Sequence, residues 1–261
     1  MGKNDLIDKK YWNNYWKDIS LPLEIKKTKK NLYLNEILNV FDKYLQINEN
    51  LSVLEIGGSP GQFLVYMHNN YKYNINCLDY SEIGCLKTED NFKLLNINGM
   101  VYKEDLFSEN LNLPMFDIVY SLGFIEHFND INLVISNHLK LLKPGGILLI
   151  GTPNFKGIYR WFLKRLAPEL LSQHNLSTMN ISNWKSFELE YKLEVMFKGY
   201  VGGFEPYIFK RKEKASFRND ILLFIAKVLN FFLHSHFRFL RKYNSKKISG
   251  YVLGIYKKPN L

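Results

Sequence analysis

Residues 51–153 alternate between strand-like and helix-like segments, and this alternation constrains the fold more than any other feature of the sequence. Strands joined by crossover helices form a parallel sheet with both faces covered. We therefore predict an α/β fold: a Rossmann-like, doubly wound, mostly parallel sheet with helices on both faces. The apolar runs that indicate its first five strands are 51–57, 74–80, 100–106, 115–123 and 147–154, the last preceded by a KPGG turn.

Further segments extend this core at both ends of the chain. Residues 193–203 and 250–258 are strand candidates that suit an antiparallel pair at one edge, bringing the sheet to seven strands. The connection between them is too long for a hairpin loop and is predicted to be an insertion. The resulting division is an N-terminal helical lid or cap at 1–48, a main domain at 49–204 and 249–261, and a basic amphipathic helical insertion at 205–248.

The net charge of +10 belongs to the C-terminal part of the chain. From Glu205 to Leu261 there are 13 Lys and Arg against 3 Asp and Glu, so this segment carries the whole excess. Cys77 and Cys85 are too few for a disulfide framework and lack metal-site spacing. The N-terminal residues lack the apolar core of a signal peptide, and no apolar run is long enough to span a membrane. These features predict a cytoplasmic protein, with peripheral membrane association as an open alternative.

Residues 221–242 of the insertion have the spacing of a helix with a wide apolar face. This face could pack on the domain itself or on a second copy in a homodimer, or it could roof a lipid-like substrate. It could also lie in a membrane interface, where basic residues in and around 217–243 would meet anionic lipid. Nucleic acid is not predicted as a partner, because apolar residues dominate and no nucleic-acid motif is present. The polar residues of its narrow stripe are Lys227, Asn230, His234, Arg238 and Arg241.

A glycine-rich turn, EIGGSPG at residues 55–61, follows the first strand. Such a turn lets the backbone approach a ligand at the start of the next helix. A dinucleotide fingerprint beginning at Gly57 would need glycine at positions 59 and 62, where the chain has Ser59 and Gln62. Glu55 would also repel a pyrophosphate, whereas it suits S-adenosylmethionine, which carries a sulfonium and an ammonium group and no phosphate.

Acidic residues also end the second and third predicted strands. Asp79, with Tyr80 beside it, is placed to accept hydrogen bonds from the two ribose hydroxyls of the cofactor. Asp105 is placed within reach of the adenine amine, and the backbone of Leu106 is available to the ring. Because the carboxyl ends of neighbouring parallel strands meet in one crevice, Glu55, Asp79 and Asp105 are predicted to converge there.

The stretches VLEIGGSPG, LDYS, KEDL, FDIVYSLGFIEHF and LKPGGILLIGTPN, in this order, resemble the class I S-adenosylmethionine-dependent methyltransferase superfamily. The resemblance covers roughly residues 50–155 and is nearest to small-molecule enzymes of the ubiquinone-biosynthesis type. The resemblance implies S-adenosylmethionine as the cofactor. The chain departs from the family pattern at Ser59, where glycine is usual. The predicted cofactor contacts are Glu55, Gly57, Gly58, Ser59, Gly61, Asp79, Tyr80, Asp105, Leu106, Ser121 and Leu122.

Two histidines are candidates for catalysis, because methyl transfer to an oxygen or nitrogen that keeps its proton benefits from a general base. His127 follows the fourth strand in GFIEHF and is predicted to contact substrate or cofactor, with base catalysis as the further hypothesis. His174 lies after the fifth strand, where related enzymes build the substrate pocket. The structural alternatives are a carbonyl-bonded histidine for His127 and a solvated loop histidine for His174. No metal site is predicted.

These features together predict a methyltransferase that transfers in line to a small molecule or to a glycan- or lipid-linked precursor. Near the N-terminus, Tyr11, Trp12, Tyr15 and Trp16 predict a helix that closes over the cofactor or packs on the domain. One alternative is a macromolecule-directed methyltransferase, which is weakened because SLGF replaces an Asn-Pro-Pro-Tyr-type clamp after the fourth strand. Another is a non-catalytic scaffold with the cofactor fold that acts through its basic helix.

Overall fold

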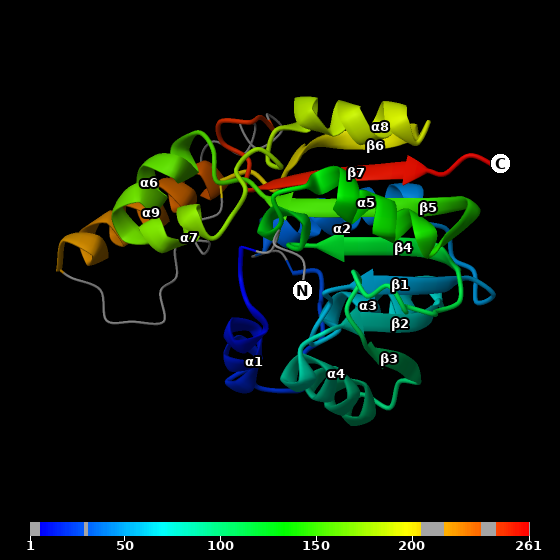
Figure 1. The fold of residues 1–261 in the computed structure, drawn as a ribbon. Helices are drawn as coiled ribbons and strands as arrows, with labels where there is room; N and C mark the ends of the chain where they lie inside the picture. The colour runs from blue at the N-terminus through cyan, green and yellow to red at the C-terminus, as the bar shows by residue number, and fades with distance from the viewer. Residues whose placement is uncertain (1–5, 29–30, 205–216, 236–243, 261) are drawn as a thin grey trace.

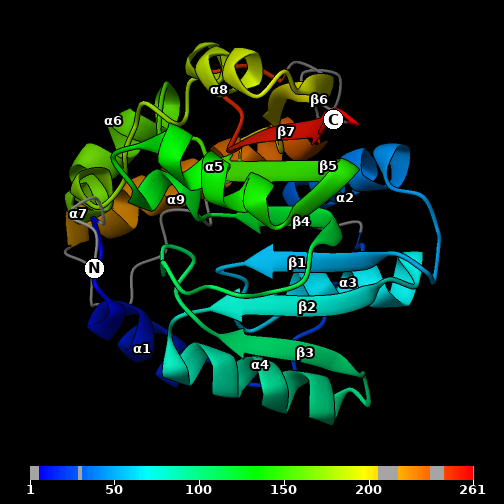
Figure 2. The same ribbon diagram turned by 45° about the vertical axis from the view of Figure 1, so that its right-hand side comes forward.

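The structure of the protein, a computed structural model, describes residues 6–28, 31–204, 217–235 and 244–260. Its centre is a seven-stranded sheet in the order β3-β2-β1-β4-β5-β7-β6, with helices packed on both faces (Figures 1 and 2). The predicted α/β architecture is confirmed. The strands are β1 (Ser52–Ile56), β2 (Asn74–Asp79), β3 (Gly99–Lys103), β4 (Phe116–Leu122), β5 (Leu142–Pro153), β6 (Glu194–Val201) and β7 (Tyr251–Lys257).

Some helices precede the sheet and others connect its strands. A further group lies beyond the carboxyl ends of the parallel strands. The first two, α1 (Lys9–Lys17) and α2 (Leu32–Tyr44), confirm the helices expected before β1. The others are α3 (Gln62–Tyr71), α4 (Glu82–Leu94), η1 (Ile125–His127), α5 (Ile131–Lys140), α6 (Ile158–Leu166), α7 (Pro168–Ser172), η2 (Ile181–Trp184), α8 (Lys185–Glu190) and α9 (Phe217–Ser235).

Parallel pairing joins β3, β2, β1, β4 and β5. The chain progresses outward from β1 to β3 and then crosses back to β4, so the direction of progress reverses between β1 and β4. In such sheets ligands bind outside the carboxyl ends of the strands at this junction. β7 is antiparallel and lies between β5 and β6, pairing with both. The predicted antiparallel closure of one edge by the two C-terminal strands is confirmed.

The KPGG segment lies inside β5 instead of forming a turn before it, which corrects the sequence prediction. β4 pairs first with Leu142 and next with Ile147, so the residues between them form an irregularity in the ladder. Gly145 has a φ of +70° there, which glycine adopts without the strain that a side chain would add.

Two apolar clusters cover the two faces of the sheet. One is formed with α2 and α3, and the other with α5 and α8. Successive residues of β1 pack alternately into the two clusters: Val53 belongs to the first cluster and Leu54 to the second. The same alternation directs Glu55 toward the face of Val53, so an acid occupies a position that strand geometry buries.

A third cluster lies beyond the carboxyl ends of the parallel strands, where α6, α7 and α9 gather (Figure 1). α9 contacts it through Leu222, Leu223 and Ala226, so part of the insertion packs on its own domain. Phe224 and Phe231 remain 66% and 63% exposed. The end of the predicted 221–242 helix, from residue 236 on, lies outside the described residues. No helix in the described part of the chain combines the length and apolarity that crossing a bilayer requires.

Glu188 on α8 links this helix to strands β6 and β7. Its carboxylate accepts hydrogen bonds of 2.7 Å from Lys198 Nζ and 2.9 Å from the hydroxyl of Tyr256. We expect Lys198→Met to lower the free energy of unfolding by about 2 kcal/mol, because it leaves a carboxylate with 8% exposure short of donors. Lys185→Met, at an exposed position on the same helix, is the control. Denaturant unfolding at pH 7 measures both, and equal midpoints for the two variants would contradict the expectation.

Candidate active site

A cavity of about 630 Å³ opens at the carboxyl ends of the parallel strands. Its walls come from the ends of β1, β2 and β4, from the loops that follow β3 and β4, and from α1, α2 and α7. The structure brings most of the predicted site residues together around it. Those that line it are Glu55, Gly57, Gly58, Ser59, Asp79, Tyr80, Asp105, Leu106, Leu122, His127 and His174.

Gly61 and Ser121 do not line the cavity, although both were predicted as cofactor contacts. Gly61 is the N-cap of α3 with a φ of +80°, and a Cβ there would meet the ring of Phe92 at 2.8 Å. Ser121 is fully buried in β4, with its hydroxyl 3.0 Å from Nε2 of His138. Strand alternation explains the second difference: adjacent residues face opposite sides of the sheet, and Leu122 is the one that reaches the cavity.

The glycine turn holds the backbone close to the acid that precedes it. Gly57 has a φ of +67°, and a Cβ on Gly58 would overlap the side chain of Glu55. A side chain at position 58 would therefore displace the carboxyl group. Ser59, where related enzymes usually have glycine, is not among the residues with positive φ, so a side chain fits its backbone. Its hydroxyl is buried 3.3 Å from that of Thr88.

Glu55 and Asp79 are buried acids, 3% and 6% exposed. Burial raises the pKa of Glu55 to about 8, and the neighbouring carboxylate of Asp79 adds to the rise. One oxygen of Glu55, Oε2, has no hydrogen-bond partner in the described part of the protein. Burial also raises the pKa of Asp79, opposed by hydrogen bonds that include one of 2.8 Å from the backbone N–H of Ser81. Both acids would gain from a cationic ligand.

Asp105 lies just beyond β3, which ends at Lys103, so it follows the strand instead of ending it. Its Oδ1 accepts a 2.9 Å hydrogen bond from the backbone N–H of Phe107, which orders the turn. Leu106 between them is buried, and Glu104 before them also lines the cavity. A third carboxylate, from the loop after β3, thus lines the same cavity as Glu55 and Asp79.

Glu126, His127 and His174 form a cluster at the side of the cavity next to α7. One ligand atom from each lies within 4.8 Å of the others, and the two imidazole rings are 4.6 Å apart. Such a set could hold a metal ion, although no metal was predicted. Sequence reasoning missed Glu126, which η1 buries to 1% exposure. Its place directly before His127 was the one signal available.

Both histidines of the cluster are neutral at pH 7. Burial lowers the pKa of His127 to about 3, helped by the proximity of His174, and it lowers the pKa of His174 to about 4. Nδ1 of His127 lies 3.3 Å from the carbonyl oxygen of Gln173, and Nδ1 of His174 lies 2.6 Å from that of Leu170. A carbonyl oxygen only accepts, so we assign the proton to Nδ1 and the lone pair to Nε2 on each ring.

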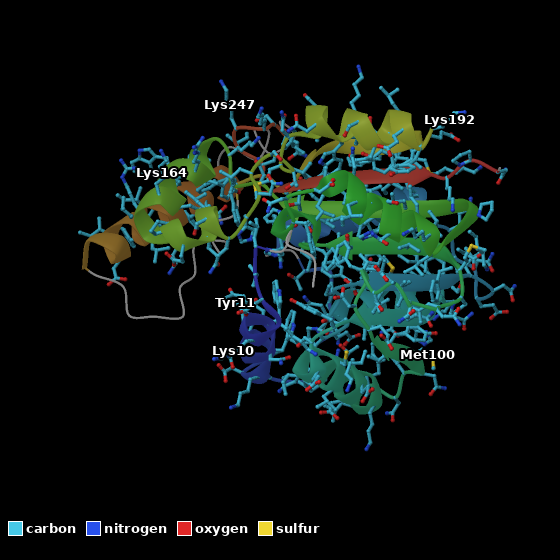
Figure 3. The ribbon with its side chains drawn as sticks, viewed as in Figure 1. Lys10, Tyr11, Met100, Lys164, Lys192 and Lys247 are labelled. Carbon is cyan, nitrogen blue, oxygen red and sulfur yellow. The ribbon has the colours of Figure 1, made fainter. Side chains whose placement is uncertain are left out.

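The aromatic residues of α1 line the cavity from the side opposite the sheet. Tyr11, Trp12, Tyr15 and Trp16 all contribute, and the ring of Trp12 lies 5.1 Å from that of His127. Tyr11 is 36% exposed on this helix, which Figure 3 shows beyond the carboxyl ends of the strands. A hydrogen bond of 2.7 Å between Ser81 and Asn13 connects α1 to the start of α4. The helix therefore sits where the predicted lid would lie.

The strand order defines a Rossmann-like α/β fold, and the acidic cavity lies at the reversal of strand order, where such sheets bind ligands. A family model described as "Methyltransferase domain" matches residues 27–191, which is more than half of the chain. The chain belongs to this methyltransferase family.

Proteins that are similar to this chain are also methyltransferases. A malonyl-[acyl-carrier protein] O-methyltransferase of Bacillus anthracis is 31% identical over 122 residues, covering 45% of this chain and 43% of the relative. A sterol 24-C-methyltransferase of Clavispora lusitaniae is 27% identical over 154 residues, covering 58% and 39%. The chain thus spans about two fifths of the length of these relatives. The crystal structure of coclaurine N-methyltransferase bound to N-methylheliamine and SAH shares the fold, with a TM-score of 0.57, 13% identity and coverage of 96% and 86%.

Cofactor affinity should depend on the ionisation of Glu55. Because its pKa is raised to about 8, a cationic ligand that favours the carboxylate must displace a proton below that pH. We expect the affinity for S-adenosylmethionine to rise by about 50-fold between pH 6 and pH 8 relative to the Glu55→Gln variant, in proportion to the ionised fraction of Glu55. Calorimetry in buffers of different ionisation enthalpy measures the proton release. Parallel pH profiles for the two proteins would refute the coupling.

Proposed function

We propose that the protein is an S-adenosylmethionine-dependent methyltransferase that acts on a small molecule. The observation that carries the proposal is the convergence of Glu55, Asp79 and Asp105 in one cavity that no Lys or Arg of the described residues lines. Such a cavity suits a ligand with a sulfonium and an ammonium group. The methyltransferase family of the chain and the SAH bound to a structural neighbour support the same cofactor.

The residues present fit this cofactor. Asp79 would accept hydrogen bonds from the ribose hydroxyls, and Asp105 with the backbone of Leu106 would contact the adenine. The turn at 57–59 would lie along the methionine part, above Oε2 of Glu55, which has no hydrogen-bond partner among the described residues. Tyr80 and Leu122 complete the predicted contacts. When bound, the cofactor supplies an electrophilic methyl group on a positively charged sulfur.

His127 and His174 would act on the acceptor. Each keeps a lone pair on Nε2, so either can take the proton that the acceptor loses as its oxygen or nitrogen becomes methylated. The neutral Glu126 carboxyl group beside them would accept a hydrogen bond from the resulting imidazolium. Holding the acceptor in line is the larger effect, because correct orientation alone is worth up to roughly 7–11 kcal/mol.

The helix α1 would serve as the lid. Its aromatic rings cover the cavity, with Trp12 beside His127 and Trp16 against Gly84. Its polar contacts with the start of α4 are partly exposed: Asn13 with Ser81, and Lys9 with Glu82 at 3.6 Å. Such contacts are weak, which suits a helix that opens for ligand exchange. Closed, it would exclude water from the reacting atoms.

We place the protein in the cytoplasm, with α9 in contact with a membrane surface or with a second copy in a homodimer. Support comes from the apolar side chains that α9 leaves exposed, Phe224 and Phe231 among them. The acceptor itself is a metabolite or a glycan- or lipid-linked precursor. Support for an apolar part in it comes from the rings and aliphatic side chains that line the cavity.

We expect the purified protein to transfer labelled methyl groups from S-adenosylmethionine to a small-molecule fraction of a cell extract. The double variant His127→Ala/His174→Ala should lower the rate at least about 100-fold, because it removes both bases. His68→Ala, outside the cavity, should leave the rate unchanged. Calorimetry with S-adenosylmethionine runs beside the assay. Cofactor binding without any transfer would favour the scaffold, and absence of cofactor binding would refute the proposal.

A further inference from the structure

The charge of the cavity wall restricts the acceptor as well as the cofactor. The acids Glu55, Asp79, Glu104, Asp105 and Glu126 line it, and no Lys or Arg of the described residues does. Basic side chains lie on the outside instead: Figure 3 shows the labelled lysines on α1, on α6 and elsewhere projecting outward. An anionic acceptor would enter this cavity without a counter-charge from these residues.

The hydrogen-bonding groups of the cluster formed by Glu126, His127 and His174 also disfavour an anionic acceptor. Each imidazole uses Nδ1 on a backbone carbonyl, at Gln173 and Leu170, and so offers Nε2 as an acceptor. Glu126 Oε2 is buried without a partner in the described part of the chain. The cluster therefore offers at least two acceptors and at most one donor, the proton of the carboxyl group.

A carboxylate or phosphate needs several donors, and against this cluster its lone pairs would face lone pairs. A hydroxyl or amine supplies the missing donor to Nε2 or to Oε2. Aromatic rings flank the cluster: the ring centroid of Trp12 lies 5.1 Å from that of His127, and the ring centroid of Phe155 lies 4.8 Å from that of His174. Phe128 and Leu170 line the same cavity. A group buried there unpaired would lose its hydration without compensation.

We propose that the acceptor presents an O–H or N–H donor to Glu126, His127 and His174 on an apolar body and carries no anionic group. The acceptor class is thus a phenol, an alcohol or an amine. This inference rests on the proposed function, since it assigns this side of the cavity to the acceptor.

Probes with one aromatic body and different polar groups test the proposal. The intact protein is saturated with S-adenosylhomocysteine, whose own binding is established first by calorimetry. 2-Naphthol, 2-naphthylmethylamine and 2-naphthoate are then titrated, with quenching of tryptophan fluorescence and calorimetry as readouts, since Trp12 and Trp16 line the cavity. We expect the naphthol and the amine to bind at least about tenfold more tightly than the naphthoate.

A charge variant supplies the matched control. Leu170→Arg places a cation in the cavity wall and should shift the preference toward 2-naphthoate by about tenfold or more. Ser172→Arg, at an exposed position of α7 outside the cavity, should leave the preference unchanged. Thermal unfolding confirms that both variants fold.

Three results would overturn the inference: 2-naphthoate binding to the wild type as tightly as 2-naphthol, no binding of 2-naphthol at all, or binding that EDTA abolishes. The last would assign the cluster to a metal ion. Failure of S-adenosylhomocysteine to bind would instead defeat the proposed function, so the two failures are distinguishable.

Discussion

Desolvated carboxyl groups at strand ends determine what this cavity can bind. Moving a carboxylate from water into a protein interior costs several kcal/mol unless a cation or several donors compensate. Glu55 and Glu126 each keep an oxygen without a partner among the described residues, and burial raises the pKa of both to about 8. In their neutral form the two acids carry no such cost. A cationic ligand would compensate the ionised carboxylates for the hydration that they lose on burial.

The sheet supplies the geometry for this arrangement. Parallel strands place their carboxyl ends on one edge, and the reversal of strand order between β1 and β4 opens the crevice there. The glycine turn after β1 keeps the Glu55 carboxyl in position, because a side chain on Gly58 would occupy the same space. The position of the Glu55 carboxyl group thus depends on the glycine-rich turn after β1, which is visible in the sequence.

The features that the sequence predicted correctly are those that short-range patterns of residues determine. The strands, the convergence of the three acids and the antiparallel C-terminal pair all derive from periodicity and from residues adjacent to strand ends. Errors arose where one residue decides the outcome. Ser121 faces α5 because its neighbour Leu122 lies on the cavity side. KPGG belongs to β5 because β4 already pairs with Leu142, which precedes that segment.

The second half of the site depends on tertiary contacts that no local pattern contains. His174 reaches His127 only because α7 packs beyond the strand ends, and Glu126 matters only once the two rings meet it. Likewise, the spacing of the insertion predicted a wide apolar face but did not reveal which part α9 would cover with Leu222, Leu223 and Ala226. Long-range packing, not propensity, settles such features.

The cofactor affinity of an Asp79→Ala variant tests the central claim most directly, that carboxylates at neighbouring strand ends hold a nucleoside bearing a cationic sulfur. Calorimetry would compare it with Asp90→Ala, an exposed position on α4. We expect the dissociation constant for S-adenosylmethionine to rise at least about tenfold at Asp79 and to stay unchanged at Asp90. Equal affinity for the wild type and the Asp79 variant would contradict the claim.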